Sequence, residues 1–266
     1  MIPRPERYKR NVAMTLTSRL SEAAIRHVET LECGRSDVIA ARLYAFHRFP
    51  TTLAWRALFA SGAATAKYLG IARHPSLRRD WSFIDIASNN WFAWRRAGPD
   101  GDAESRFKLY VSPHCSDLPE VLASAIQAFT EGGATAFKVG TGADGIVRPD
   151  KLIGYFPDMK MLDRTAGILT NALAGARAHG VPFTCQLDLD GVLSWGVDPP
   201  KFSLSGDTLS WRQWITQYLA RWMLEDGRTV ASRSASDHAL RRLQQAGVDV
   251  TTWTPVVPIW TATVDG

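Results

Sequence analysis

The spacing of apolar residues predicts helices in the first third of the chain and a mixture of strands and helices after it. Apolar side chains recur at helical intervals in three early segments, each bounded by a capping residue, a glycine or a proline. The expected helices cover residues 16–32, residues 36–44 and, with Thr51 or Thr52 as the cap, a segment that ends at or beyond residue 58. The aromatic stretch 81–96 fits either a strand or the surface of a helix.

The clearest break in the sequence is the run Gly98-Pro99-Asp100-Gly101, which predicts a loop. We therefore expect a basic helical N-terminal region at residues 1–98 and a second domain at residues 99–266. After the break, the predicted order of elements from Arg106 to Trp195 is β-α-β-β-α-β-β. That order is typical of the α+β class, with helices packed on one face of a mostly antiparallel sheet and the other face free to bind.

Three predicted strands each bring at least one cation to this sheet. They read RFKLYVSPH at residues 106–114, TAFKVGTG at residues 135–142 and IVRPDKLIGYFPD at residues 146–158. In the first strand, alternation places Phe107, Leu109 and Val111 on one face and turns the residues between them, Lys108 and Tyr110, to the other. Lys138 lies between two apolar residues of the second strand, and the third strand adds Arg148, Lys151 and Tyr155.

The remaining elements follow the same kinds of signal. Helices are expected over residues 118–130, 164–179 and 236–245, and a half-buried strand over residues 183–189 leads through a tight turn at Asp190-Gly191 into a strand over residues 192–195. Ser210 is expected to cap a helix whose tryptophans form a wide apolar stripe. The width of that stripe indicates core packing and not a cofactor site.

Composition places the chain among ordinary globular proteins. It has 266 residues, of which 45% are hydrophobic and 21% charged, which is enough to bury a core. The three cysteines, Cys33, Cys115 and Cys185, are widely spaced and odd in number, so we expect no disulfide framework or zinc site and a reducing, cytoplasmic location. Because no long apolar run occurs, we expect neither a signal peptide nor a membrane span.

The net charge of +5 is unevenly distributed along the chain. Residues 1–96 hold 16 Lys and Arg against 7 Asp and Glu, whereas the remainder holds 15 against 19. A solvated basic surface would explain this excess, and so would an acidic partner of the first third of the chain.

Several familiar catalytic motifs are absent from the sequence. It contains no GxxxxGK[ST] phosphate loop, no HExxH and no GxSxG, and its six histidines are scattered. GTGADG at residues 140–145 is a single GxGxxG match, which is a weak signal by itself. Asp188 and Asp190 could lie on the same side of one predicted strand, where a carboxylate pair can bind a metal or share a proton. We favour the simpler interpretation, a solvated strand face beside a turn, and expect no metal site.

The cations of the three predicted strands form the strongest candidate site. If the strands are neighbours, up to five cations converge with two tyrosines, and such a surface favours an anion, most often phosphate. A lysine that is crowded by cations and partly removed from water gives up its own proton more readily, so Lys138 becomes able to abstract one. Cations that also hold a departing phosphate would complete the requirements for β-elimination.

The order FKLYV, helix, AFKV, an arginine and a strand with Y-x-PD resembles the phosphothreonine lyase family of bacterial effectors. Relatives of that family are the lyase domains of lanthipeptide synthetases and the HopA1-type lyases of other ribosomal peptide pathways. The resemblance covers roughly residues 106–200. It implies removal of phosphate from phosphoserine or phosphothreonine, which leaves dehydroalanine or dehydrobutyrine, without a metal or organic cofactor.

The resemblance also implies roles for single residues. Lys138 matches the proton-abstracting lysine of the family, Arg148 a phosphate-binding arginine and Tyr155 a tyrosine of the following strand. Arg106 stands where the family carries a phosphate-binding lysine, and Lys151 is a further candidate for binding phosphate.

This sequence departs from the family at two places. Lys108 replaces a histidine that acts as general acid, so Lys108 or His114 would protonate the leaving phosphate, unless it leaves unassisted. A later phosphate-binding arginine is missing from its expected strand, and Arg164 or Arg212 would have to replace it.

Two other functions stay open on the sequence alone. The first is a non-catalytic module that binds a phosphopeptide or docks a partner. The second, which we favour least, is nucleic-acid binding through the basic first third. For a lyase, the partner would be a phosphorylated peptide, and the basic first third with Trp91 and Trp94 would grip an acidic leader peptide or a separate kinase.

Overall fold

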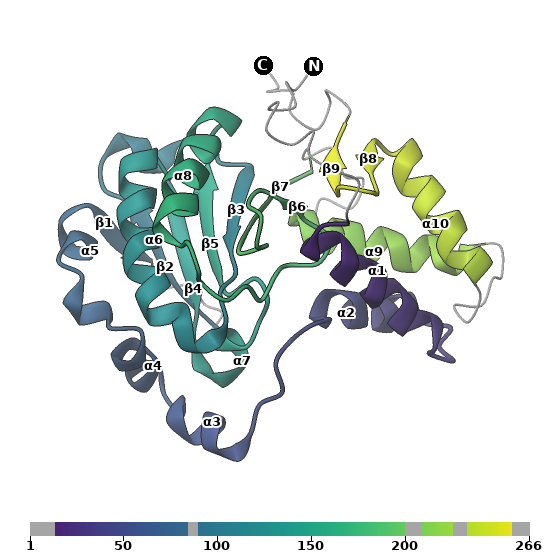
Figure 1. Cartoon of the computed structure of the whole chain (residues 1–266), viewed down its shortest axis with the longest axis horizontal. Helices are drawn as coiled ribbons and strands as arrows, with labels where there is room; N and C mark the ends of the chain where they lie inside the picture. The colour runs from purple at the N-terminus through teal and green to yellow at the C-terminus, as the bar shows by residue number, and fades with distance from the viewer. Residues whose placement is uncertain (1–13, 85–89, 200–208, 226–232, 257–266) are drawn as a thin grey trace. The chain divides into compact units, whose positions relative to one another are not determined.

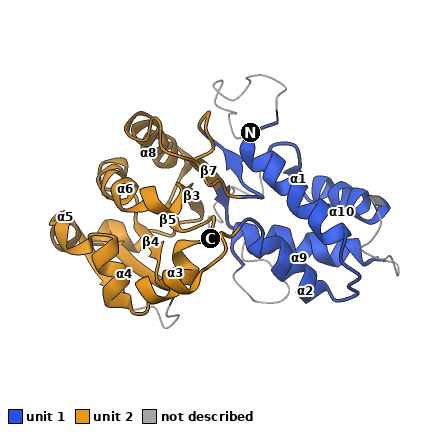
Figure 2. Ribbon diagram, turned by 60° about the horizontal axis from the view of Figure 1, so that its bottom comes forward, with its two compact units in different colours: residues 1–47, 182–187, 196–266 blue, residues 48–181, 188–195 orange. Residues whose placement is uncertain are grey.

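The computed structural model describes residues 14–84, 90–199, 209–225 and 233–256. The chain divides into two compact units (Figure 2). The first unit comprises Met1–His47, Pro182–Leu187 and Gly196–Gly266, and the second comprises Arg48–Val181 and Asp188–Trp195. This division falls after His47, and the boundary that we predicted after residue 98 stays a prediction.

Within the described residues, the first unit is built mainly on four helices. Its α9 begins with a capping box, because the side chains of Ser210 and Gln213 each accept a hydrogen bond from the other residue's backbone amide. The predicted tryptophan stripe is core, since Trp211 is fully buried and α9 packs against α2 and α10. The elements of this unit are α1 (Leu16–Glu29), α2 (Ser36–Ala45), β6 (Cys185–Gln186), α9 (Trp211–Met223), α10 (Arg233–Gln245), β8 (Val248–Asp249) and β9 (Thr254–Pro255).

The second unit is organised around a twisted sheet (Figure 1). Its strands follow the order β1-β2-β4-β5-β3-β7. The neighbouring pairs β1–β2, β2–β4, β4–β5 and β5–β3 are all antiparallel. The aromatic stretch 81–96, for which we predicted either a strand or the surface of a helix, contributes two strands to this sheet, β1 and β2. The strands are β1 (Trp81–Ile84), β2 (Trp91–Arg96), β3 (Phe107–Val111), β4 (Ala136–Gly140), β5 (Leu152–Phe156) and β7 (Leu193–Val197), which starts in this unit.

Two helices, α6 (Leu118–Gly132) and α8 (Met159–Ala172), cover one face of the sheet. The ring of Phe129 on α6 packs on Phe137 and Phe156, with ring centroids 5.6 and 6.3 Å apart. Because successive side chains of a strand alternate, Lys138 and Tyr155 are turned to the opposite face. This arrangement confirms the predicted α+β class with an antiparallel sheet and helices on one face.

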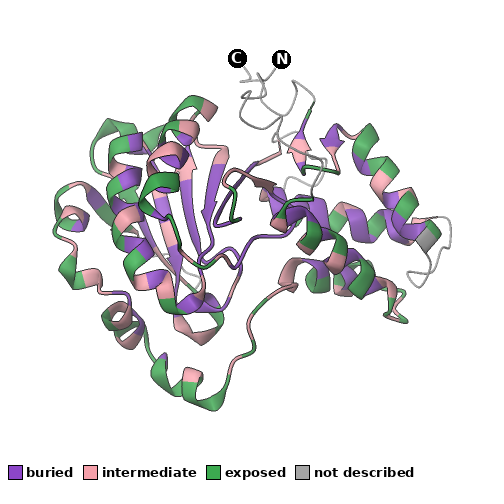
Figure 3. Cartoon of the chain, viewed as in Figure 1, coloured by how far each residue is buried: buried purple, intermediate pink, exposed green. Residues whose placement is uncertain are grey.

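Short elements connect these parts of the second unit. Thr52 caps α3 by accepting a hydrogen bond from the amide of Trp55, as one of the two capping alternatives predicted. In Figure 3 this helix is coloured as exposed or half-buried along its length. The short elements are α3 (Leu53–Leu58), α4 (Gly62–Tyr68), η2 (Ile71–Arg73), α5 (Ser76–Arg79), η3 (Pro99–Asp102), η4 (Cys115–Asp117) and α7 (Gly142–Ile146).

The predicted strand over residues 146–158 is wrong in its first half. Residues Gly142–Ile146 form the short helix α7, and β5 begins only at Leu152. Arg148 and Lys151 therefore lie in the connection before β5 and not on a strand.

Two further predicted elements have different bounds. The helix expected over residues 164–179 starts earlier, because the side chain of Asp158 accepts a hydrogen bond from the Met161 amide and caps α8. The strand expected over residues 183–189 shrinks to β6, since Phe183 has a positive φ of 63°. Asp188 accepts hydrogen bonds from the amides of residues 191–193, so it closes a turn instead of lining a strand.

Among the described helices, none has the length and the apolar character that crossing a membrane requires.

Candidate active site

Cations and aromatic rings gather on the face of the sheet that lies opposite α6 and α8. Lys138 on β4 stands directly between Ala93 on β2 and Ile153 on β5. Lys108 on β3 stands directly opposite Tyr155 on β5. Since directly opposed residues of neighbouring strands share a face, both lysines and the tyrosine belong to one surface.

Trp91 connects the predicted base with the predicted phosphate ligand. The Lys138 Nζ lies 4.3 Å from the centre of the Trp91 ring, and the guanidinium carbon of Arg148 lies 4.6 Å from the same centre. Cations at such distances are attracted by an aromatic ring. One indole ring therefore contacts a cation of β4 and a cation of the connection that follows it.

Tyr155 connects the two lysines in a similar way. The Lys138 Nζ lies 5.7 Å from its ring centre and the Lys108 Nζ lies 5.3 Å from it. Lys108 is 6% exposed, whereas Lys138 and Tyr155 are half-buried. We refer to Trp91, Lys108, Lys138, Arg148 and Tyr155 as the cation–aromatic cluster.

A buried carboxylate fixes the orientation of Arg148. Its Nε and Nη2 donate to the two oxygens of Asp150 over 2.8 and 2.9 Å. The two side chains are 13% and 3% exposed. The guanidinium therefore has two fixed neighbours, the Asp150 carboxylate and the Trp91 ring that Lys138 also contacts.

A small apolar core lies beneath the cluster. Tyr110, Ile153 and Val181 are buried together, and the rings of Trp91 and Tyr155 pack against them. The residues just before and at Val181 therefore cover part of this face, which the sequence did not predict. Trp94, which we expected to grip a peptide together with Trp91, is 4% exposed and stacks on Phe137, so it belongs to the core on the other face.

Lys151 is not part of the cation–aromatic cluster. It is fully buried, and its Nζ donates to the Pro113 carbonyl over 2.8 Å and lies 2.6 Å from Nδ1 of His179. Burial lowers the pKa of Lys151 to about 7. The His179 ring is itself stacked on Phe49, with centroids 4.0 Å apart. This placement gives no support to a role in binding phosphate, and that role stays a prediction.

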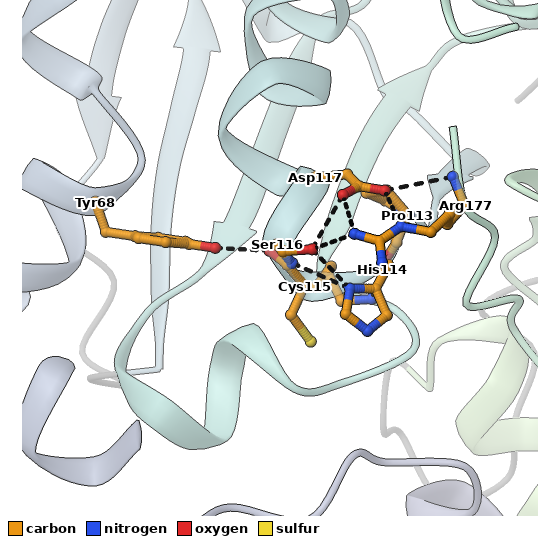
Figure 4. Close-up of polar contacts among 8 residues, drawn as sticks. Tyr68, Pro113, His114, Cys115, Ser116, Asp117 and Arg177 are labelled. Carbon is orange, nitrogen blue, oxygen red and sulfur yellow. Dashed lines mark hydrogen bonds and ion pairs between the residues drawn. The ribbon is translucent and has the colours of Figure 1, made fainter. Parts of the chain in front are cut away.

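His114 belongs to a separate polar network (Figure 4). Its Nδ1 lies 2.8 Å from the Ser116 hydroxyl, which also donates to Asp117 over 3.0 Å. Arg177 donates to both oxygens of Asp117 over 2.6 and 3.1 Å, and this hydrogen bonding lowers the pKa of Asp117 to about 2. The network fastens the segment around Arg177 to the start of α6, and it does not bring His114 to the cluster.

The three other arginines that we considered as phosphate ligands lie in different parts of the structure. Arg106 is half-buried directly before β3 and two residues from Lys108, which fits the side of the sheet that carries the cluster. Arg164 is exposed on α8, which covers the other face. Arg212 is 1% exposed in the first unit and donates to the carbonyls of Pro182 and Tyr44. These contacts give Arg212 a structural role, and its role as the missing phosphate ligand stays a prediction without support from its placement.

Two residues of the site were missed or given another role by the sequence analysis. Trp91 was expected to grip a partner, and Asp150 was given no role. The R-P-D order of residues 148–150 was the available signal for the ion pair, since an arginine two residues before an aspartate can form a bidentate contact. No group of three or more potential metal ligands occurs in the part of the chain that the structure describes.

Comparisons with known proteins find similar structures but no similar sequence. No family model and no curated protein matches this sequence. The structure is similar to that of an effector protein from Pseudomonas syringae pv. syringae strain 61, with 12% sequence identity over 90% of this chain and 98% of that chain and a TM-score of 0.54. The two chains share a fold.

Other solved structures match less closely. An effector protein from Pseudomonas syringae pv. tomato strain DC3000 matches with 13% identity over 89% of this chain and 96% of that chain, at a TM-score of 0.48. A phosphothreonine lyase effector from Chromobacterium violaceum, VirA (SpvC), matches with 14% identity over 62% and 77%, at a TM-score of 0.36.

Proposed function

We propose that this protein is a lyase that removes phosphate from phosphoserine or phosphothreonine in a peptide by β-elimination. The observation that carries the proposal is the contact of Lys138 and Arg148 with one indole ring, with Lys108 on the same face of the sheet. A proton acceptor, an oriented phosphate anchor and a third cation are thereby grouped around one surface. β-Elimination from a phosphorylated side chain needs those three parts.

The reaction would begin at Lys138. In its neutral form, the Lys138 amine takes the proton from the α-carbon of the phosphorylated residue. The electron pair of that C–H bond forms the Cα=Cβ double bond, and the Cβ–O bond breaks with its electrons on the departing phosphate. The products are dehydroalanine or dehydrobutyrine and phosphate, and no redox partner is involved.

Cations would hold the phosphate and balance its charge as it leaves. Arg148 is the principal ligand, because Asp150 and Trp91 fix its guanidinium before any substrate binds. Arg106 and Tyr155 would contribute from the neighbouring strands, and Lys151 only if its ammonium left the Pro113 carbonyl. Lys108 is placed better than His114 to protonate the phosphate, since Lys108 lies within the cation–aromatic cluster.

The proposed setting is the modification of a ribosomally made peptide in the cytoplasm, as in lanthipeptide pathways. A separate kinase, or another reaction that phosphorylates serine or threonine, would have to supply the substrate. The steps above use side chains alone, so we expect no metal or organic cofactor.

Mass spectrometry of a phosphothreonine peptide after incubation with the protein tests this proposal. The peptide is expected to lose one phosphoric acid, and added thiol is expected to trap the dehydroamino acid. Lys138→Ala should abolish product, whereas Lys160→Ala, at an exposed lysine of α8, should leave turnover unchanged. Full turnover by Lys138→Ala, or phosphopeptide that stays intact, would contradict the proposal.

A second candidate is a non-catalytic module that binds phosphopeptides. The specific observation in its favour is that the Trp91 ring attracts Lys138 in its charged form, which binds an anion well but abstracts no proton. Titration with phosphorylated and unphosphorylated peptide separates the two candidates. Tight, phosphate-dependent binding without product would favour the binding module.

A further inference from the structure

A stretch of the second unit before its first strand carries only positive charge. Residues 48–79, here called the basic segment, contain six Lys and Arg and no Asp or Glu. Asp80 follows directly, and its carboxylate is paired with Arg79 over 2.9 Å. The part of the segment before Arg79 therefore has no acidic residue of its own to balance its cations.

The same segment exposes large apolar side chains. Leu53 and Leu58, at the two ends of α3, are 87% and 53% exposed, and α3 contains no buried residue. Arg56 lies between them on the same helix and is also exposed. Exposed leucines close to an exposed cation are typical of a surface that meets a partner.

The basic segment lies beside the loop that carries Arg148. The amide of Phe49 donates to the carbonyl of Val147, the residue before Arg148, over 3.2 Å. The hydroxyl of Thr65 on α4 accepts from the amide of Gly142, where α7 begins, and α3 packs against α7. The neighbouring helix α7 carries one acidic residue of its own, Asp144, which is exposed.

We propose that α3 and α4 dock the part of the peptide substrate that flanks its phosphorylated residue, and that this flank carries acidic and apolar side chains. The inference rests on the proposed function, because Arg148 is the phosphate anchor that fixes where the flank begins. Acidic groups would pair with Arg56 and Lys67, and apolar groups would cover Leu53 and Leu58. A basic flank would be repelled by the same cations, so the surface would also select between peptides.

A lipid surface is a less suitable partner for these elements. Helices that lie in a membrane interface are usually long enough to present a continuous apolar face. Here α3 and α4 have 6 and 7 residues and are fastened to α7, the helix before the Arg148 loop. Anionic vesicles are accordingly a competing ligand in the experiment and not part of the proposal.

Fluorescence anisotropy with two labelled phosphothreonine peptides tests the inference. One peptide has aspartate and leucine in its flanks and the other has lysine and serine. The double variant Arg56→Glu with Lys67→Glu should weaken binding of the first peptide by about tenfold and strengthen binding of the second, because the reversed charges attract its lysines. The double variant Leu53→Ser with Leu58→Ser should weaken binding of the first peptide by about tenfold and leave the second within about twofold. Lys160→Glu on α8 is the control for a charge reversal elsewhere and should change neither affinity.

The same variants separate the docking surface from the chemistry. If docking and lyase activity are both present, the KM of the acidic peptide rises while kcat is unchanged. Tight, flank-dependent binding with no product would overturn the lyase and leave the docking surface standing. Equal affinity for both peptides, or binding to phosphatidylserine vesicles that the Arg56→Glu and Lys67→Glu changes abolish without any flank preference, would overturn the docking surface.

Discussion

The ammonium nitrogen of Lys138 lies over the indole ring of Trp91, 4.3 Å from its centre. The ring attracts the positive form of the lysine, including the form that arises when Lys138 has taken a proton from substrate. Arg148 contacts the same ring, so one tryptophan supports both the proposed base and the proposed phosphate anchor. Trp91 is therefore expected to matter for the rate without touching the phosphate itself.

Replacement of Trp91 tests that role. Trp91→Leu should lower kcat/KM by roughly 3- to 30-fold, the range that corresponds to one or two lost cation–π contacts. Phe92→Leu is the matched control, because Phe92 is the next residue on β2 and alternation turns it to the opposite face. Equal losses in the two variants, measured with circular dichroism to confirm folding, would show that only packing of the strand is involved.

Two arginine–aspartate pairs of the same spacing differ in burial. Arg148 and Asp150 are 13% and 3% exposed, whereas Arg35 and Asp37 form the same bidentate contact at 73% and 67% exposure. Asp150→Asn should lower the free energy of unfolding by about 3 kcal/mol, since it leaves a buried guanidinium without its charged partner.

Asp37→Asn is the control for that change and should not alter stability measurably, because water screens an exposed pair. Urea denaturation of both variants measures the difference. If Asp150→Asn were as mild as Asp37→Asn, Arg148 would have another partner of similar strength, and its orientation would not depend on Asp150.

The buried ammonium of Lys151 should make stability depend on pH. Burial lowers its pKa from 10.5 to about 7, so between these values the unfolded chain binds a proton that the folded chain does not. The free energy of unfolding should therefore rise with pH in this window, by about 2 kcal/mol from pH 7 to pH 9. Lys151→Met should lack that increase.

Urea denaturation of wild type and Lys151→Met at both pH values measures the effect. Burial raises the pKa of the neighbouring Cys115, which acts in the opposite direction but is present in both proteins. The difference between the two pH dependences therefore reports on Lys151. Parallel curves would mean that Lys151 remains charged at pH 7 to 9 in the folded protein.

Packing of α6 on the sheet should be sensitive to a single methyl group. A Cβ at Gly154 would come within 2.6 Å of the Phe129 ring, so Gly154→Ala should cost about 1 to 3 kcal/mol. Gly167→Ala on α8 meets nothing within 4 Å and should stabilise the protein by up to about 1 kcal/mol. Thermal unfolding of the two variants checks the opposite signs, and a stable Gly154→Ala would mean that α6 can move away from β5.

Helices and alternating strands were predictable where burial follows a regular period. α1, α6 and α9 show apolar spacing with a recognisable stop or cap. The residues of β3 alternate in the sequence, although four of its five residues are buried. The short helix α7 was missed because it contains two glycines and has too few apolar residues to show a period. A Cβ at Gly140 would meet the backbone of Gly145, and the amide of Gly142 donates to Thr65 on α4, and neither contact follows from a sequence pattern.

The candidate site was predictable in its strand residues and not in its connections. Alternation placed Lys108 on the same face as the tyrosine that stands opposite to it, because both lie on regular strands. Lys151 was also predicted to lie on a strand, yet it lies in the connection before β5, where no period fixes the direction of a side chain. Its burial against His179 depends on a segment 28 residues away.

The alternation of β4 joins the stability of this unit to its chemistry. Phe137 is 1% exposed against α6, and the adjacent Lys138 faces the cluster. A shift of β4 by one residue against its neighbours would push the lysine under the helix and send the phenylalanine into the site. An inserted or deleted residue in this strand would thus remove the core contact and the base together, so the strand has almost no freedom to drift in evolution without losing both.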